Sequence, residues 1–193
     1  MPMEQILPDR INTPAQTENA TCGLVLIITG NGKGKTTAAM GLVLRAWGHN
    51  KRVIMLQFIK NAKANFGEHR AARKMGIAVV AGGDGFARPG VMGDIEKSET
   101  MAADLWEFAK ETISSGNYDM VVLDELSYPL RFGWLNTGDV IETLRNRPSG
   151  LHVVITGRDM PQELIEFADS VTEAVEIKHH YKKGIKAQPG IEF

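Results

Sequence analysis

The sequence predicts an α/β protein with a mostly parallel sheet of about six strands and helices on both faces. From residue 24 onward, short runs rich in β-branched residues alternate with longer helical patterns, which is typical of successive β-α-β units. Most of the short runs are apolar throughout, as expected for strands that helices cover on both sides. The first run leads directly into a glycine-rich segment and then a helical pattern, which favours a nucleotide-binding domain.

Six segments are expected to form strands and four to form helices. The strands are 24–29, 52–58, 77–81, 120–124, 151–156 and 171–177, and the helices are 36–48, 94–114, 137–146 and 161–168. The first helix is apolar nearly all round, which predicts burial, whereas the second carries one apolar stripe and a charged opposite face. Asp159 is placed to cap the last helix, with Pro161 near its first turn.

Length and composition indicate one folded domain after an irregular beginning. The chain has 193 residues and is 43% hydrophobic, so residues 23–193 are expected to form a single catalytic domain and residues 1–22 a polar segment. A net charge of -1 argues against broad attraction to nucleic acid or to an anionic membrane. Cys22 is the only cysteine, which excludes an intrachain disulfide and suits a reducing cytoplasm. The first residues lack the apolar run of a signal peptide, and no stretch approaches the ~18 apolar residues of a membrane span.

The glycine-rich segment is a shortened form of the phosphate-binding loop. The usual spacing, G-x-x-x-x-G-K-[ST], has a glycine six residues before the lysine, where this sequence has Thr29 and the glycine follows at Gly30. Glycines let backbone N–H groups turn toward an anion, and the helix N-terminus adds partial positive charge. Lys35 supplies a charge to phosphate oxygens, and the Thr36 hydroxyl is a Mg²⁺ ligand. The sequence therefore predicts a P-loop NTPase-like (RecA-like) domain whose nucleotide contacts are Gly30, Asn31, Gly32, Lys33, Gly34, Lys35, Thr36 and Thr37.

Two acids follow the fourth expected strand. Asp124 and Glu125 end the run MVVLDE, so in a parallel sheet they lie at the edge where ligands gather. Together with Thr36 they are candidates to hold Mg²⁺, whereas an acidic pair taken alone is more often a turn or a cap. A hydrolytic ATPase with Glu125 activating water and a small-molecule kinase therefore both stay open. A kinase lid would draw on the available arginines, Arg131, Arg145, Arg147 and Arg158.

Further stretches give the chain a more specific resemblance. They are GGDGF at 82–86, LDELSYPLRFGWL at 123–135, VVITGR at 153–158 and KAQPGIEF at 186–193. With TGNGKGKTTAAMG at 29–41, they resemble the ATP:corrinoid adenosyltransferases of the CobA/BtuR type over roughly residues 23–193, a family that carries the same shortened loop. The resemblance implies that a corrinoid reduced to Co(I) attacks the 5′ carbon of ATP, forms a cobalt–carbon bond and releases triphosphate, in adenosylcobalamin biosynthesis or corrinoid salvage.

The resemblance also implies roles for individual residues. Because cobalt is the nucleophile, the protein needs no general base, and it positions the substrates and stabilises the departing triphosphate. Lys33, Lys35, Thr36 and Mg²⁺ (or Mn²⁺) suit that task, and Glu125 becomes a metal ligand. Phe86 would lie on the lower corrin face and exclude the lower axial ligand of cobalt. Lys35, Thr36 and Phe86 are therefore the expected catalytic residues.

Several nearby residues carry weaker indications. Arg88 stands where some family members have a second aromatic residue beside the corrin. Tyr128 and Trp134 follow the acids and are candidates either for the corrin side of the cleft or for packing. The adjacent His179 and His180 resemble a metal pair, but on an extended segment they are expected to point apart as solvated side chains.

The expected partners follow from the same resemblance. ATP and a corrinoid are the substrates, and a reduced flavoprotein is a suitable electron donor. The net charge and the lack of a long apolar run, rather than the resemblance, give the expectation that neither nucleic acid nor a membrane is a partner. The family forms homodimers in which the N-terminal segment, here residues 1–22, can cover the neighbouring active site. Two other function classes stay open, a hydrolytic P-loop ATPase and a nucleotide-dependent regulatory module without turnover.

Overall fold

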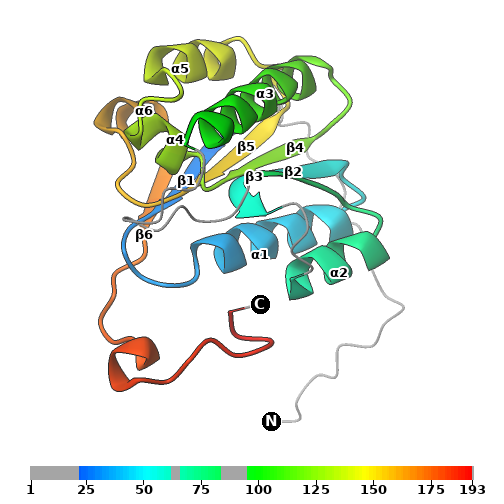
Figure 1. Ribbon diagram of the computed structural model, residues 1–193. Coiled ribbons are helices and arrows are strands. Elements are labelled where there is room, and N and C mark those ends of the chain that lie inside the picture. The colour runs from blue at the N-terminus through cyan, green and yellow to red at the C-terminus, as the bar shows by residue number, and fades with distance from the viewer. Residues whose placement is uncertain (1–21, 62–65, 84–94, 193) are drawn as a thin grey trace.

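A computed structural model describes residues 22–61, 66–83 and 95–192, which form a six-stranded sheet with helices on both faces (Figure 1). The strands are β1 (Val25–Thr29), β2 (Val53–Asn61), β3 (Ala78–Gly83), β4 (Met120–Asp124), β5 (His152–Thr156) and β6 (Ser170–Glu173). Their order across the sheet is β3-β2-β4-β5-β1-β6, and every neighbouring pair runs parallel. The predicted α/β fold with a parallel sheet is confirmed.

The helices form one layer on each face of the sheet. α1 (Lys35–Gly48) and α2 (Gly67–Lys74) cover one face, and α3 (Ile95–Ser114), α4 (Ser127–Arg131), α5 (Thr137–Arg145) and α6 (Gln162–Phe167) cover the other (Figure 1). Each layer seals its own apolar cluster against the sheet. Ala39, Val43 and Ala72 belong to the cluster under the first layer, and Leu105 and Leu164 belong to the cluster under the second. Both faces of the central strands are therefore buried, as continuous apolar runs predict.

The predicted strands and helices are present with small shifts at their ends. The last strand is the main exception, because β6 ends at Glu173 rather than at 177 and all four of its residues are exposed at the sheet edge. Two helices were not predicted. α2 has the polar sequence GEHRAARK and buries only Ala72, so it offers few apolar residues from which a helix could be recognised. α4 is a helix of only five residues and contains Pro129.

Burial of the helix after the loop was predicted and is wrong. α1 buries Ala39, Val43 and Ala46 against the sheet, but Leu44 and Trp47 are 54% and 45% exposed. Met40 and Leu42 are partly buried and pack against the same cluster, so one side of α1 faces the sheet and the side with Leu44 and Trp47 is exposed. The sequence pattern identified an apolar helix, but it did not show that one side of this helix would be exposed.

The predicted cap of the last helix is also wrong. The N-cap of α6 is Pro161, and no side chain caps it. Asp159 instead has a positive φ of 49° and accepts a hydrogen bond from Arg131 at 2.6 Å. The ion pair holds the loop after β5 against α4.

Within the described ranges, no helix is long and apolar enough to cross a bilayer.

Candidate active site

The phosphate loop connects the end of β1 to the start of α1. Gly30 and Gly34 adopt φ values of 95° and 103°, a left-handed region that side chains disfavour. A Cβ on Gly32 would lie 2.8 Å from the carbonyl oxygen of Ala174, and the Gly32 N–H donates to that same oxygen at 2.7 Å. The chain beyond β6 thus packs directly against the loop, so the glycines permit both its turn and this close approach.

Both loop lysines are held by acceptors within the chain. The Lys35 ammonium donates to the carbonyl oxygens of Gly30 and Gly32 at 2.7 and 2.8 Å, which curls the loop around its own lysine. Burial and the nearby Arg158 lower the pKa of Lys35, against the opposing pull of Glu125. Lys33 instead reaches the C-terminal segment, where it donates to Glu192 at 2.8 Å.

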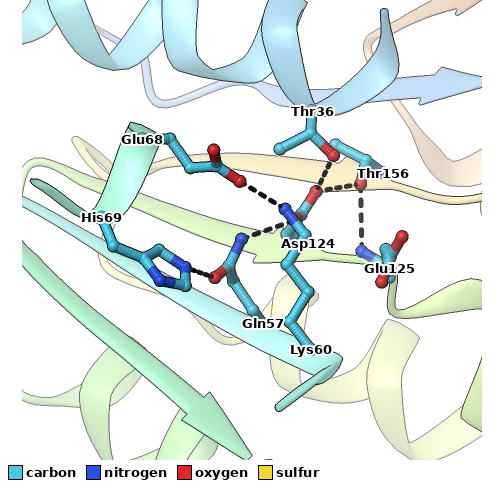
Figure 2. Close-up of polar contacts among 8 residues, drawn as sticks. All are labelled: Thr36, Gln57, Lys60, Glu68, His69, Asp124, Glu125 and Thr156. Atoms are coloured by element: carbon cyan, nitrogen blue, oxygen red, sulfur yellow. Dashed lines mark hydrogen bonds and ion pairs between the residues drawn. The ribbon is translucent and has the colours of Figure 1, made fainter. Parts of the chain in front are cut away.

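Asp124 is the centre of the polar network beside the loop (Figure 2). Its side chain is fully buried at the end of β4. One carboxylate oxygen accepts hydrogen bonds from the hydroxyls of Thr36 and Thr156 at 2.9 and 2.6 Å, and the other accepts from the Gln57 amide at 2.9 Å. The Lys60 ammonium lies 3.5 Å from that second oxygen. The buried carboxylate is thus compensated by hydroxyls, an amide and a cation that come from two strands, β2 and β5, and from helix α1.

The network extends through two residues of α2. Glu68 accepts from Lys60 at 2.8 Å, and a ring nitrogen of His69 lies 2.6 Å from the Gln57 side-chain oxygen (Figure 2). The roles of Gln57, Lys60 and Glu68 were not predicted. The available signal was the interruption of an apolar strand, VIMLQFIKN, by an amide and a lysine.

Glu125 follows Asp124 in a strained backbone conformation. Its φ is 63°, and its N–H donates to Thr156 Oγ1 at 3.0 Å. One carboxylate oxygen, Oε2, is buried and has no hydrogen-bond partner within the described residues. Burial, with a contribution from Asp124, raises the pKa of Glu125 to about 7. Such an orphaned oxygen is one that a cation or a ligand donor can satisfy.

The oxygen atoms here fit a Mg²⁺ ion. Thr36 Oγ1 lies 2.9 Å from Asp124 Oδ1, and the buried Glu125 oxygen follows on the same strand end. No group of three or more His, Cys, Asp and Glu side chains suited to a metal occurs in the part of the chain that the structure describes. The fit to Mg²⁺ rests on the oxygens themselves, because proteins commonly bind this ion through one or two carboxylates and the phosphates of a substrate.

The phosphate loop and part of the polar network border a cavity of about 620 Å³. Its walls are the loop and the start of α1, the β2–α2 region, the ends of β4 and β5, and the C-terminal segment, and they include Gly32, Lys33, Gly34, Lys35, Thr36, Thr37, Met40, Lys60, Glu68, Glu125, Tyr128, Thr156, Arg158, Ile191 and Glu192. The volume falls in the range of small-molecule sites. Two residues of the loop do not line the cavity: Asn31, which is exposed, and Gly30, whose carbonyl oxygen accepts from Lys35. Asp124 is fully buried and does not line the cavity either, although it accepts from Thr36, which does.

The other candidate residues divide between the cavity and structural roles. Arg158 lines the cavity and Arg131 pairs with Asp159. Arg147 donates to backbone carbonyls, including that of Gly23, and Arg145 lies over the ring of Phe167. Only Arg158 of these arginines is therefore placed to contact a ligand in the cavity.

The aromatic and histidine candidates also differ in position. Tyr128 lines the cavity, whereas Trp134 packs against the apolar core with its ring centroid 4.8 Å from that of Phe132. The expectation that His179 and His180 point apart is wrong, because a 3₁₀ turn at His180–Lys183 stacks their rings at 4.7 Å. Phe86, Arg88 and residues 1–21 lie outside the described residues.

The comparisons with known proteins agree with one another. The family described as "ATP:corrinoid adenosyltransferase BtuR/CobO/CobP" matches residues 21–193. The chain is 35% identical over 193 residues to the corrinoid adenosyltransferase of Escherichia coli (strain K12), covering 98% of this chain and 95% of that protein. It is 36% identical over 190 residues to the corrinoid adenosyltransferase CobA of Salmonella typhimurium, with the same two coverages. The relative from Pseudomonas aeruginosa is 40% identical over 175 residues, covering 89% of this chain and 84% of that protein.

A solved structure supports the fold independently of sequence. The flagellar accessory protein FlaH from Methanocaldococcus jannaschii superposes with a TM-score of 0.50, covering 79% of this chain and 71% of FlaH. Its sequence identity is 11%, so this likeness concerns the arrangement of the sheet and helices alone.

Proposed function

We propose, because this chain belongs to the ATP:corrinoid adenosyltransferase family, that the cavity beside its phosphate loop is the site where ATP adenosylates a corrinoid. The chain is a transferase that acts on corrinoids with ATP, and this activity is favoured over a hydrolytic ATPase or a regulatory module. The observation that carries the site assignment is the convergence of Lys33, Lys35 and Thr36 with Glu125 on one cavity.

The reaction requires charge stabilisation on the leaving group. Co(I) of the corrinoid substrate donates an electron pair to the 5′ carbon of ATP, the cobalt–carbon bond forms, and the electrons of the breaking C5′–O bond leave on triphosphate. Triphosphate carries about four negative charges near neutral pH, so preorganised cations and amides lower the barrier to its departure. Lys33, Lys35 and the N-terminus of α1 supply such groups on one side of the cavity.

Mg²⁺ is the cation that these residues suit. Thr36 and Asp124 would hold it, with Glu125 supplying its otherwise unsatisfied oxygen. When bound, the ion neutralises part of the charge on the triphosphate. Gln57 and Thr156 orient the Asp124 carboxylate by hydrogen bonds, so they act as positioning residues for the metal site.

The corrinoid side of the site rests on the resemblance. We propose that Phe86 lies on the lower corrin face, that residues 1–22 cover the active site of a neighbouring subunit in a homodimer, and that residues 23–193 form the catalytic domain. A cytoplasmic location and a reduced flavoprotein as electron donor belong to the same proposal. Tyr128, which lines the cavity, is the described aromatic residue placed nearest to this role.

The products of ATP test the proposed function. Attack at carbon releases intact triphosphate, whereas an ATPase or kinase attacks the terminal phosphorus and releases ADP. We expect triphosphate formation to depend strictly on reduced corrinoid and on Mg²⁺, with equal amounts of a light-sensitive adenosylated product. Chromatography of the nucleotides measures both outcomes, and steady ADP release without a corrinoid would contradict the proposal.

A further inference from the structure

One lysine that lines the cavity, Lys60, is neither part of the phosphate loop nor a candidate metal ligand. Lys60 projects from the end of β2, lines the cavity, and lies between Glu68 and Asp124 (Figure 2). We propose that Lys60 is a further phosphate-binding residue of this site, which exchanges its ion pair with Glu68 for the triphosphate of bound ATP. The proposal rests on the proposed function and names the group that holds the leaving triphosphate from the β2 side of the cavity.

Lys60 has the charge and burial that such a contact needs. Its side chain is 16% exposed, and its ammonium is 2.8 Å from Glu68 and 3.5 Å from Asp124. A cation shielded from water in this way interacts more strongly with an arriving anion than a solvated surface lysine does.

The ion pair with Glu68 can be exchanged without leaving Asp124 unsatisfied. Asp124 already accepts hydrogen bonds from Thr36, Thr156 and Gln57, so its compensation does not depend on a short contact to Lys60. The Lys60 ammonium has three donors and is free to keep its position near Asp124 while one donor turns to a phosphate oxygen. In this proposal the contact that the phosphate replaces is the one to Glu68.

Glu68 is the element that makes this contact reversible. Its carboxylate lines the same cavity and is 20% exposed. Without the Lys60 ammonium beside it, this carboxylate would repel a triphosphate in the cavity. Lys60 can then be held by Glu68 before ATP binds and again after triphosphate leaves. Removing Lys60 should weaken triphosphate binding, and removing the charge of Glu68 should strengthen it.

A purely structural ion pair predicts a different pattern. If Lys60 and Glu68 only join β2 to α2, then Lys60→Met and Glu68→Gln should both lower the melting temperature, and neither should tighten anion binding. Opposite effects of the two variants on triphosphate affinity therefore distinguish a binding role from a structural one.

Titration calorimetry with inorganic triphosphate and Mg²⁺ tests the proposal. We expect Lys60→Met to weaken binding by at least about tenfold, the loss expected for one hydrogen bond to a charged group, and Lys60→Arg to recover most of it. Glu68→Gln should tighten binding by about threefold or more, because a neighbouring negative charge is removed. Lys110→Met removes a lysine that pairs with Glu107 on α3, outside the residues lining the cavity, and is the matched control that should bind like the parent.

Two results would overturn the assignment. One is parent-like binding by folded Lys60→Met, and the other is unchanged or weaker binding by Glu68→Gln, which decides the matter even if the lysine variant fails to fold. Adenosylation by the parent protein is measured separately. A parent that binds triphosphate through Lys60 but adenosylates no corrinoid would refute the proposed function and leave this assignment standing.

Discussion

Replacing Thr156 by valine tests whether the Thr156 hydroxyl stabilises the buried Asp124 carboxylate. Thr156 is fully buried, and its hydroxyl both donates to Asp124 at 2.6 Å and accepts from the Glu125 N–H at 3.0 Å. Valine keeps the branched shape but supplies neither function. The carboxylate then loses one of its donors, and a partly buried N–H loses its acceptor.

The size of the effect follows from these two contacts. A hydrogen bond to a charged group contributes about 1.5–3 kcal/mol, and an orphaned buried donor costs about 1–3 kcal/mol. Because the two losses share one hydroxyl, we expect them to add incompletely and to lower the free energy of unfolding by about 3 kcal/mol. For a chain of this size that corresponds to a fall in Tm of roughly 6–12 °C.

Thermal melting of Thr156→Val beside a matched variant measures this effect. Thr143→Val is the control, because the Thr143 hydroxyl donates only to the backbone oxygen of Asp139 within helix α5, at 2.8 Å. Its Tm should change by less than about 4 °C, the shift expected for 1 kcal/mol. A Thr156→Val protein that melts within a degree of the parent would refute the reasoning that this hydroxyl supports the buried carboxylate.

Two further variants probe the loop and the C-terminal segment. Lys35→Ala should reduce ATP-dependent turnover by at least about tenfold, because the protein loses a positive charge that stabilises the departing triphosphate. Its Tm should stay within about 4 °C of the parent. Full activity at saturating ATP would remove the loop from the catalytic site. Glu192→Gln should speed proteolysis of residues 184–192 by about threefold or more, because Glu192 accepts from Lys33 and pairs with His180, each at 2.8 Å. Cleavage at the parent's rate would show that these contacts do not hold the segment over the cavity.

The amino-acid sequence determined the features that are local along the chain. The apolar runs, the glycines of the loop and the Lys35-Thr36 pair follow one another in order, so the strand, the turn and the helix were all predictable, as was the family. The place of Asp124 and Glu125 at the end of a buried strand was also predictable, because the apolar run that precedes them is visible in the sequence.

Only the tertiary structure decided which residues surround the buried carboxylate. Gln57, Lys60 and Thr156 come from strands on either side of β4, and the strand order brings them to Asp124. Hydrophobic periodicity marks the face that an element buries, but it does not name the element that lies against that face. The same limit explains why the exposed side of α1 was predicted to be buried. It also explains why the ion pair between Lys33 and Glu192, 159 residues apart, was not foreseen, since chain folding alone sets such a distance.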